Sequence, residues 1–282
     1  ALWKKAKPNE PFWESPWGEG RPGWHIECSV MSSKYLGLPI DIHGGAVDLI
    51  FPHHENEIAQ SEAAYDVKPF VKYWLHTGFL VIEGQKMSKS LGNFITVPEL
   101  LEKYDARVFR FFIATKHYRS RVDFAKDAMV HATNTLKRLN DFIQRLYEVE
   151  ASGPCNVDAI VSKARKEFEQ AMDDDFNAPL AWRAIFNLET EANRLMAANK
   201  LTKDASAKII DFLKDINRIF DVFSFERKQA QLAEEDMRLI KLREKLREEK
   251  RFAEADKIRE QLKKKGIILI DTPEGTKWRP AQ

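Results

Sequence analysis

The sequence predicts an α/β layer with a parallel sheet, followed by an all-α helical bundle and a small terminal module of helices and a β-hairpin. Short apolar segments alternate with helical patterns in the first part, and apolar residues then recur at helical spacing. The last part has a charged helical stretch followed by two strand patterns. We therefore expect domains over residues 1–110, 111–225 and 226–282.

The first 24 residues are rich in proline, glycine and tryptophan. This density of breakers predicts a loop without a long helix or a regular strand. We expect Trp3, Trp13 and Trp17 to hold the loop against a core. Because the chain opens at Ala1 without a methionine, we also expect it to be a fragment of a longer protein or a processed product.

The α/β layer is expected to alternate helices and strands. The predicted helices cover residues 26–35 and 56–64, and the predicted strands cover 40–42 and 73–82. Thr96 and Pro98 have the order of a helix cap and a first turn, and so do Asn177 and Pro179. Four further helices are predicted at residues 127–148, 157–172, 178–198 and 203–222.

The terminal module is predicted to begin with a charged helical stretch over 234–265, broken near Arg251 and ended by Gly266. Strands at 267–270 and 276–278 would complete a hairpin. The basic residues of the helical stretch either form a solvated face or contact phosphates, and both interpretations stay open. They are Arg243, Arg247, Lys250 and Arg251.

The composition excludes several classes of protein. Hydrophobic residues make up 44% and charged residues 31%, and no apolar run approaches the ~18 residues that a membrane span needs. The net charge of +2 provides no strong field for nucleic acid, so any such contact must be local. Cys28 and Cys155 are too far apart for a disulfide framework, which indicates a reducing, cytoplasmic setting.

The motif Lys86-Met87-Ser88-Lys89-Ser90 places two lysines and two serines in one short loop. Ammonium and hydroxyl groups of this kind bind phosphate oxygens. Lys86 and Lys89 are the candidate catalytic residues, because charge that builds on a pyrophosphate leaving group is stabilised by such lysines. A solvated surface loop is the alternative from composition alone.

A second set of residues suggests a metal ion. His53 and Glu57 are four residues apart and share one face of a helix, whereas His54 lies about 100° away and is a poorer partner. Cys28 would add a thiolate, and all three types bind zinc. The alternative is that Cys28 is a buried small hydrophobic residue. His76 has the same two interpretations, core residue or site residue.

Glycines at a strand end allow close approach to a ligand, and an acidic residue nearby can accept hydrogen bonds from ribose hydroxyls. Gly44, Gly45 and Asp48 have this arrangement, and a tight turn is the alternative.

Residues 86–90 match the KMSKS signature of class I aminoacyl-tRNA synthetases, and segments 23–29, 41–48 and 51–57 resemble the cysteinyl-tRNA synthetase family. The resemblance implies the C-terminal half of a Rossmann-type nucleotide-binding fold, then tRNA-binding helices and an anticodon module. In this family two cysteines, a histidine and a glutamate hold zinc. Cys28, His53 and Glu57 match three of them, and the fourth ligand and any HIGH tetrapeptide are missing from the sequence.

The resemblance also implies a reaction. ATP with Mg²⁺ activates cysteine as an adenylate, and the cysteinyl group is transferred to tRNA(Cys). Zinc would recognise the substrate thiolate, with Trp24 and His43 beside it. The ATP would contact Gly44, Gly45, Asp48 and Lys89. Trp278 would stack on an anticodon base, with Arg279 nearby.

Two other interpretations remain open. A related ligase of the mycothiol pathway joins cysteine to an amino sugar, and a chain with half a nucleotide fold can act as an RNA-binding fragment without catalysis. The terminal module argues against the amino-sugar ligase, which needs no anticodon reader. We expect the isolated chain to be inactive. The sequence does not indicate the oligomeric state.

Overall fold

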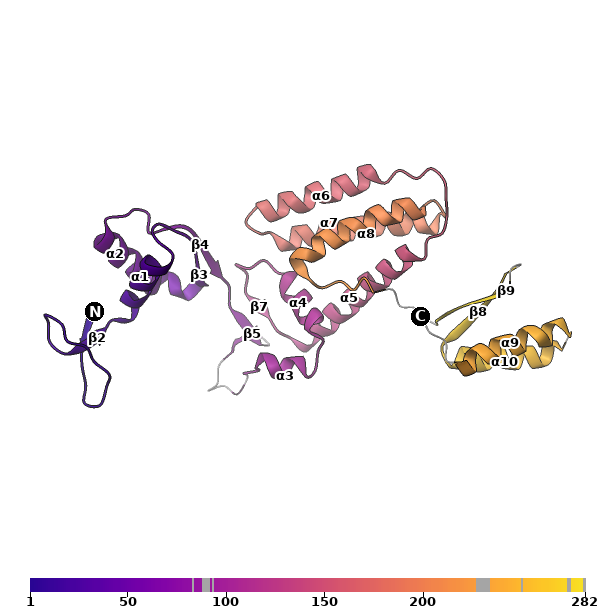
Figure 1. Ribbon diagram of the computed structural model, residues 1–282, viewed down its shortest axis with the longest axis horizontal. Coiled ribbons are helices and arrows are strands. Elements are labelled where there is room, and N and C mark those ends of the chain that lie inside the picture. Colours follow the sequence, from indigo (N-terminus) through magenta and orange to yellow (C-terminus); the bar gives the residue numbers. More distant parts are fainter. Residues whose placement is uncertain are drawn as a thin grey trace. The chain divides into compact units, whose positions relative to one another are not determined.

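The computed structural model describes residues 1–82, 84–87, 92, 94–226, 234–249, 251–272 and 275–280. The chain divides into two compact units, Ala1–Phe225 and Glu226–Gln282, which we call unit 1 and unit 2 (Figure 1). Each unit is described by itself. None of the helices in the described ranges is long and apolar enough to cross a membrane.

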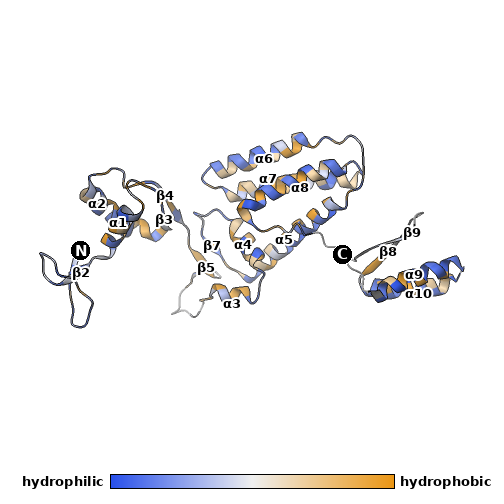
Figure 2. Ribbon diagram, in the orientation of Figure 1, coloured by the Kyte–Doolittle hydropathy of each residue, from blue (hydrophilic) through white to orange (hydrophobic). Residues whose placement is uncertain are grey.

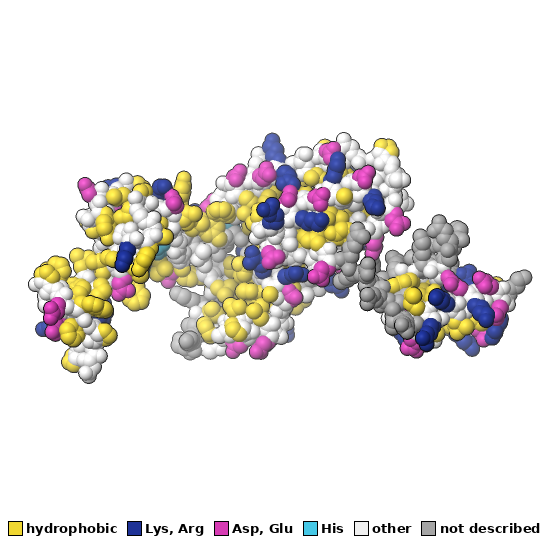
Figure 3. All heavy atoms as spheres, in the orientation of Figure 1, with side chains coloured by type: hydrophobic (Ala, Val, Ile, Leu, Met, Phe, Trp, Pro, Cys, Tyr) yellow, Lys and Arg dark blue, Asp and Glu magenta, His cyan; other side chains and the backbone are white. Residues whose placement is uncertain are grey.

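The N-terminal segment forms a small hairpin. Strand β1 (Trp3–Lys5) pairs antiparallel with β2 (Gly20–Pro22), so the expectation that breakers exclude strands was wrong for these three-residue elements. The prediction that tryptophans hold this segment against a core was also wrong in part, because the side chains of Trp13 and Trp17 are 58% and 79% exposed. Figure 3 shows hydrophobic side chains gathered on the surface of this part of unit 1.

The α/β layer follows in the predicted order and its sheet is parallel. Its elements are α1 (Trp24–Tyr35), β3 (Ile40–Ala46), η1 (Val47–Leu49), η2 (Ile50–His54), α2 (Glu55–Tyr65) and β4 (Val71–Thr77). Strands β3 and β4 run parallel from the pair Ile40 and Val71 to the pair Ala46 and Thr77. Strand β3 is longer than predicted, because its glycines stay in register with β4 instead of forming a turn.

The predicted strand over 73–82 is two strands in different sheets. Strand β4 ends before Gly78, and β5 (Leu80–Ile82) pairs with β6 (Gln85–Lys86) and, in parallel, with β7 (Val122–Asp123). The Gly78 N–H donates to the Tyr118 carbonyl at 2.7 Å. A Cβ at Gly78 would lie 2.1 Å from the Ser120 carbonyl oxygen, so the crossing of a second backbone divides the strand here.

Helix α3 (Val97–Leu101) begins with the predicted cap. Thr96 accepts a hydrogen bond from the Glu99 N–H, and the Glu99 carboxylate accepts one from the Thr96 N–H at 2.8 Å. This reciprocal pair satisfies two of the donors that a helix start leaves open. Helix α4 (Ala106–Ala114) follows α3 in unit 1.

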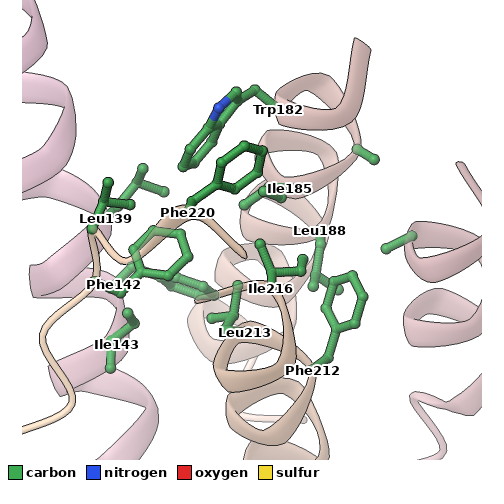
Figure 4. Packing of buried hydrophobic residues seen from close by; sticks show 14 of the residues in the cluster. Leu139, Phe142, Ile143, Trp182, Ile185, Leu188, Phe212, Leu213, Ile216 and Phe220 are labelled. Carbon is green, nitrogen blue, oxygen red and sulfur yellow. The ribbon is translucent and has the colours of Figure 1, made fainter. Parts of the chain in front are cut away.

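The four predicted helices form the core of unit 1. They are α5 (Lys126–Tyr147), α6 (Asp158–Asp173), α7 (Ala178–Ala197) and α8 (Lys203–Phe220), within a residue or two of the sequence prediction. Asn177 caps α7 as expected. Figure 2 shows hydrophilic and hydrophobic residues on different sides of these helices. Their apolar sides meet around Trp182, whose ring stacks on Phe220 at 4.9 Å (Figure 4).

Unit 2 is the predicted helix pair with a hairpin. It contains α9 (Glu234–Glu248), α10 (Phe252–Lys264), β8 (Ile267–Thr272) and β9 (Gly275–Pro280). Gly266 has φ of 79° at the end of α10, the left-handed conformation expected of a glycine after a helix. Leu246, Ile258 and Leu262 belong to a small core of their own.

Asp175 joins the turn between α6 and α7 to the loop that follows α4. Its carboxylate accepts hydrogen bonds from the Tyr118 hydroxyl at 2.6 Å and from two nitrogens of Arg119 at 2.5 and 3.0 Å. The hydrogen bonds from Arg119, and then the one from Tyr118, lower the pKa of Asp175 to about 2. The loop from Tyr118 to Ser120 also crosses Gly78, so this ion pair fixes the bundle to the end of β4.

We predict that Asp175→Asn removes part of the acid sensitivity of unit 1. Because the folded-state pKa lies below the ordinary value of 3.8, the ionised group stabilises the fold above that pH. This stability is lost as the pH falls from 3.8 towards 2. Urea unfolding at a series of pH values should therefore give a flatter slope over this window in Asp175→Asn than in the native protein.

Asp211→Asn is the matched control, since Asp211 is an exposed residue of α8 that lies 3.6 Å from Lys214. Its slope should follow that of the native protein. Equal slopes for the native protein and Asp175→Asn would contradict the assignment.

Candidate functional site

Helices α1 and α2 pack side by side and carry the polar residues of the site. The Ser61 hydroxyl donates to the Ser29 hydroxyl at 2.7 Å, and both side chains are buried. This bond fixes the two helices one turn after His25 on α1 and one turn after Glu57 on α2, and Cys28 directly precedes Ser29. His53 lies in η2, two residues before α2 begins and one turn before Glu57.

The Glu57 carboxylate lies at the centre of this group. It is 1% exposed, with Oε1 3.0 Å from His53 Nε2 and Oε2 3.5 Å from His43 Nε2. Neither oxygen has a hydrogen-bond donor in acceptable geometry among the described residues. Burying a carboxylate without donors is costly unless the group is paired or binds a metal ion. The carboxylate therefore has the surroundings of a cation ligand.

Two overlapping groups of residues can hold a metal ion here. In each, one donor atom per residue lies within 4.8 Å of the others. The first consists of His25, His53 and Glu57, and the second of His43, His54 and Glu57. Imidazole nitrogen and carboxylate oxygen are both zinc ligands. Of the predicted ligands, the structure brings His53 and Glu57 together.

Cys28 lies beside the same carboxylate. Burial first, and then the nearby charge of Glu57, raise the pKa of the Cys28 thiol to about 11. Cys28 is not a member of either group with donors within 4.8 Å. A cation at the site would reverse this electrostatic situation, because a coordinated thiol loses its proton.

Imidazole and indole rings stack on one another beside these metal-binding groups. His43 stacks on Trp74 at 4.7 Å, and Trp74 stacks on His76 at 5.9 Å. His54 Nδ1 lies 2.8 Å from His76 Nε2, within hydrogen-bond distance. Burial is the main cause that lowers the pKa values of His25, His54 and His76. Burial therefore disfavours the protonated form of these imidazoles, and a neutral imidazole has a lone pair that can bind a cation.

Sequence reasoning undervalued three of these histidines. His54 was set aside for its angle to His53, yet the two approach Glu57 from different sides, in separate groups. His25 had one signal, its position three residues before Cys28 on one helical face. His76 needed the register of β4 beside β3.

The glycines of β3 have different surroundings. A Cβ at Gly45 would lie 2.7 Å from Cε1 of His54, whereas a Cβ at Gly44 would make its shortest contact, of 3.4 Å, with the Leu75 carbonyl oxygen. Gly45 therefore makes room for the buried His54 ring. Gly44 and Asp48 are exposed, and Trp24 at the start of α1 is 69% exposed.

The signature loop is described only in part. Lys86 lies in β6, paired with Val81 of β5, while Lys89 falls outside the described residues. The strand before this loop and the helix after it are both present, as β5 and α3.

The residues of unit 2 that are candidates for contacting RNA differ in their surroundings. Trp278 is half-buried and packs against the core of the module, and Arg279 lies on β9. Arg243 is 2% exposed and donates to the Thr276 hydroxyl at 3.3 Å, so its burial fits neither the solvated face nor the phosphate contact that the sequence left open. Arg251 is held by Glu249 and Glu254.

Three family models match the chain in order. The catalytic domain of class I (C) tRNA synthetases matches residues 1–134 and the DALR domain matches 167–225. The anticodon-binding domain of cysteinyl-tRNA ligase matches 229–279. This chain belongs to the cysteinyl-tRNA synthetase family. The last match lies within unit 2, and the first extends beyond the boundary at residue 110 that the sequence predicted.

Relatives in the cysteinyl-tRNA synthetase family are similar along the whole chain. A protein of Thermococcus gammatolerans named cysteine–tRNA ligase is 49% identical over 99% of this chain. One of Carboxydothermus hydrogenoformans with the same name is 47% identical over 99%. The chain spans 61% of the length of each relative. It corresponds to the C-terminal portion of the family.

A solved structure supports the class I fold. The LeuRS of Agrobacterium radiobacter, in a ternary complex with tRNA and LeuAMS, aligns with 75% of this chain and 33% of its own at a TM-score of 0.54. At 14% identity this likeness concerns the fold alone. It agrees with the parallel strands and helical bundle predicted from the sequence.

We predict that Gly45→Ala disturbs the site and that Gly44→Ala does not. The added methyl at position 45 would have to displace the His54 ring, since the contact would be 2.7 Å. Thermal unfolding should show a lower Tm for Gly45→Ala, and the ring resonances of His54 should shift. Gly44→Ala makes an ordinary contact at 3.4 Å and is the matched control. Equal Tm values for the two variants would contradict this role of Gly45.

Proposed function

We propose that the chain is the C-terminal portion of a cysteine–tRNA ligase, which activates cysteine with ATP and transfers it to tRNA(Cys). The main support is the 49% identity over 99% of the chain to a protein of that name. The whole activity is a proposal because the chain spans 61% of that relative. A role in protein synthesis would place the reaction in the cytoplasm.

We propose that the metal ion of the site is zinc. The buried Glu57 carboxylate, which has no hydrogen-bond partner among the described residues and is surrounded by imidazoles, fits a divalent cation. When bound, zinc would recognise the cysteine substrate as a thiolate, which a hydroxyl of serine does not match. Its ligands would include His53 and Glu57, with the Cys28 thiol beside the same carboxylate.

The surrounding residues would position the substrate. His43 contacts the Glu57 carboxylate and stacks on Trp74, which gives the site a rigid aromatic wall. Trp24, exposed at the start of α1, would cover the substrate on another side. The bond between His54 and His76 holds the buried imidazole against Gly45. A fixed arrangement of this kind lowers the cost of ordering the substrate.

ATP, with Mg²⁺, would bind along β3 and the signature loop. The exposed Asp48 carboxylate is available to ribose hydroxyls, and the backbone of Gly44 is open to a ligand. Lys86 and Lys89 would stabilise the charge that develops on pyrophosphate. The chemistry needs no nucleophilic side chain, because the substrate carboxylate attacks the α-phosphate of ATP.

Unit 2 would read the anticodon. Its match to an anticodon-binding domain favours tRNA over the amino sugar of the mycothiol-type ligase as the acceptor. Trp278 would stack on an unpaired base and Arg279 would contact phosphate, on neighbouring positions of β9.

We predict that the chain binds cysteine tRNA more tightly than other tRNAs. The contacts with the anticodon should make binding sensitive to its sequence, whereas phosphate contacts should weaken it equally for all tRNAs as salt increases. Fluorescence anisotropy with a panel of tRNAs at fixed salt measures this. An altered anticodon should weaken binding by at least about tenfold, or ~1.4 kcal/mol. Equal affinity for all tRNAs would argue against the proposed partner.

We also predict that the isolated chain does not catalyse cysteine-dependent exchange of pyrophosphate into ATP. The sequence contains no HIGH tetrapeptide, the second signature of class I enzymes, which would contact the same ATP. The assay should therefore remain at the blank level. Exchange clearly above the blank would show that these residues suffice for adenylate formation.

A further inference from the structure

Lys86, the first residue of the signature motif, belongs to a sheet of very short strands. Its backbone pairs with Val81 in the antiparallel pair of β5 and β6, and β5 pairs in parallel with β7 (Figure 1). Strands β5, β6 and β7 have three, two and two residues. Strands this short form few ladder hydrogen bonds, so their position depends on contacts outside the sheet.

Strand β7 connects this sheet to the rest of unit 1. The Val122 N–H donates to the Phe79 carbonyl at 2.8 Å, and the Phe124 N–H donates to the Val81 carbonyl at 2.7 Å. Val81 is 4% exposed and lies between Phe124 on one side and Lys86 on the other. A displacement of the segment that carries β7 would therefore reach Lys86 through Val81.

The segment that carries β7 is held at both of its ends. After the strand, the ring of Phe124 meets Phe109 and Phe112 of α4 edge to face, with centroids 6.5 and 5.9 Å apart. Before the strand, the loop of residues 117–120 binds the carboxylate of Asp175, in the turn between α6 and α7. The first anchor is apolar and comes from the preceding helix, whereas the second is polar and comes from the helical bundle.

The contact with Asp175 fixes the loop in orientation as well as in place. Arg119 Nε lies 2.5 Å from Oδ2 of the carboxylate and Nη2 lies 3.0 Å from Oδ1, which is the bidentate arrangement of a guanidinium and a carboxylate. The Tyr118 hydroxyl donates to the same Oδ1 at 2.6 Å, and the Arg119 guanidinium lies 5.1 Å from the centre of the Tyr118 ring. Three donors on one planar group leave the loop little freedom to rotate.

The turn that carries Asp175 has a strained backbone. Asp175 and Phe176 follow one another with φ of 55° and 52°, a conformation that is unfavourable for residues other than glycine and most of all for bulky ones. Both residues contact the same loop, since Phe176 meets the Tyr118 ring edge to face at 6.4 Å. Strain of this kind persists where the surrounding contacts over-determine the backbone, and it is frequent at functional sites.

We propose that Asp175 is a positioning residue for adenylate formation, and that it acts on Lys86 through Arg119, β7 and β5. This role rests on the proposed function, in which Lys86 stabilises the charge on pyrophosphate. The side chains of Asp175 and Arg119 are 42% and 53% exposed, and exposed ion pairs contribute little to stability. Removal of the carboxylate charge should therefore leave unit 1 folded and release the strand that places Lys86.

Hydrogen exchange of the purified chain, residues 1–282, tests the path from Asp175 to β6 without catalysis. In Asp175→Asn, amides of β5, β6 and β7 should exchange about two- to fivefold faster than in the native chain, the range expected when an exposed ion pair is lost. Amides in the middle of α8 should keep their native rates. Asp211→Asn is the matched control and should leave β5, β6 and β7 unchanged, because Asp211 is an exposed residue of α8. Native rates in these strands of Asp175→Asn would overturn the proposal.

Kinetics of the whole enzyme, of which this chain is the C-terminal portion, separate positioning from a structural role. In cysteine-dependent pyrophosphate exchange, Asp175→Asn should lower kcat about tenfold, because displacing a group that acts in the transition state costs rate. The KM for cysteine should stay native, since the residues around Glu57 and not Lys86 bind it in the proposed function. Asp211→Asn should keep both constants. A native kcat in Asp175→Asn would overturn the positioning role.

A second substitution identifies the group through which Asp175 acts. In a Lys86→Ala background, Asp175→Asn should lower kcat by less than about twofold, because the side chain that it positions is already absent. Equal losses in the Lys86→Ala and native backgrounds would refute the path through Lys86. A native whole enzyme without any cysteine-dependent exchange would refute the proposed function itself, whereas native kinetics in Asp175→Asn alone would refute only the role of Asp175.

Discussion

The buried carboxylate of Glu57 is the constraint on which the α/β layer depends. A charge that is 1% exposed and lacks hydrogen-bond donors in the described part of the chain has to be balanced by its surroundings. Helix α1, the η2 segment before α2 and strand β3 each place imidazoles beside it. The Ser29–Ser61 bond, the space at Gly45 and the stack on Trp74 all serve to keep these rings in place.

Much of the fold was predictable because its signals are local. The apolar period of α5 to α8 and the caps at Thr96 and Asn177 lie within a few residues of the elements they define. The predicted bounds therefore agree with the structure to within a residue or two. His53 and Glu57 were predicted in the same way, because residues four apart in a helix lie on one face.

The errors concern contacts between distant parts of the chain. The split at Gly78 is caused by a backbone some forty residues later, and the length of β3 is set by its register with β4. His25 enters the site only because α1 packs on α2, which no spacing in the sequence reveals. Exposure of Trp13 and Trp17 likewise depends on which surfaces the hairpin meets.

The small size of the hydrophobic cluster in the α/β layer has a consequence for the order of folding. The buried apolar residues of this cluster are Ile40, Phe70 and Val71, whereas the core of the helical bundle is far larger. All the donors around Glu57, from His25 onwards, belong to one short stretch of chain. Closing so short a loop loses little entropy. During synthesis from the N-terminus, this centre can thus assemble on the ribosome before α5 has emerged.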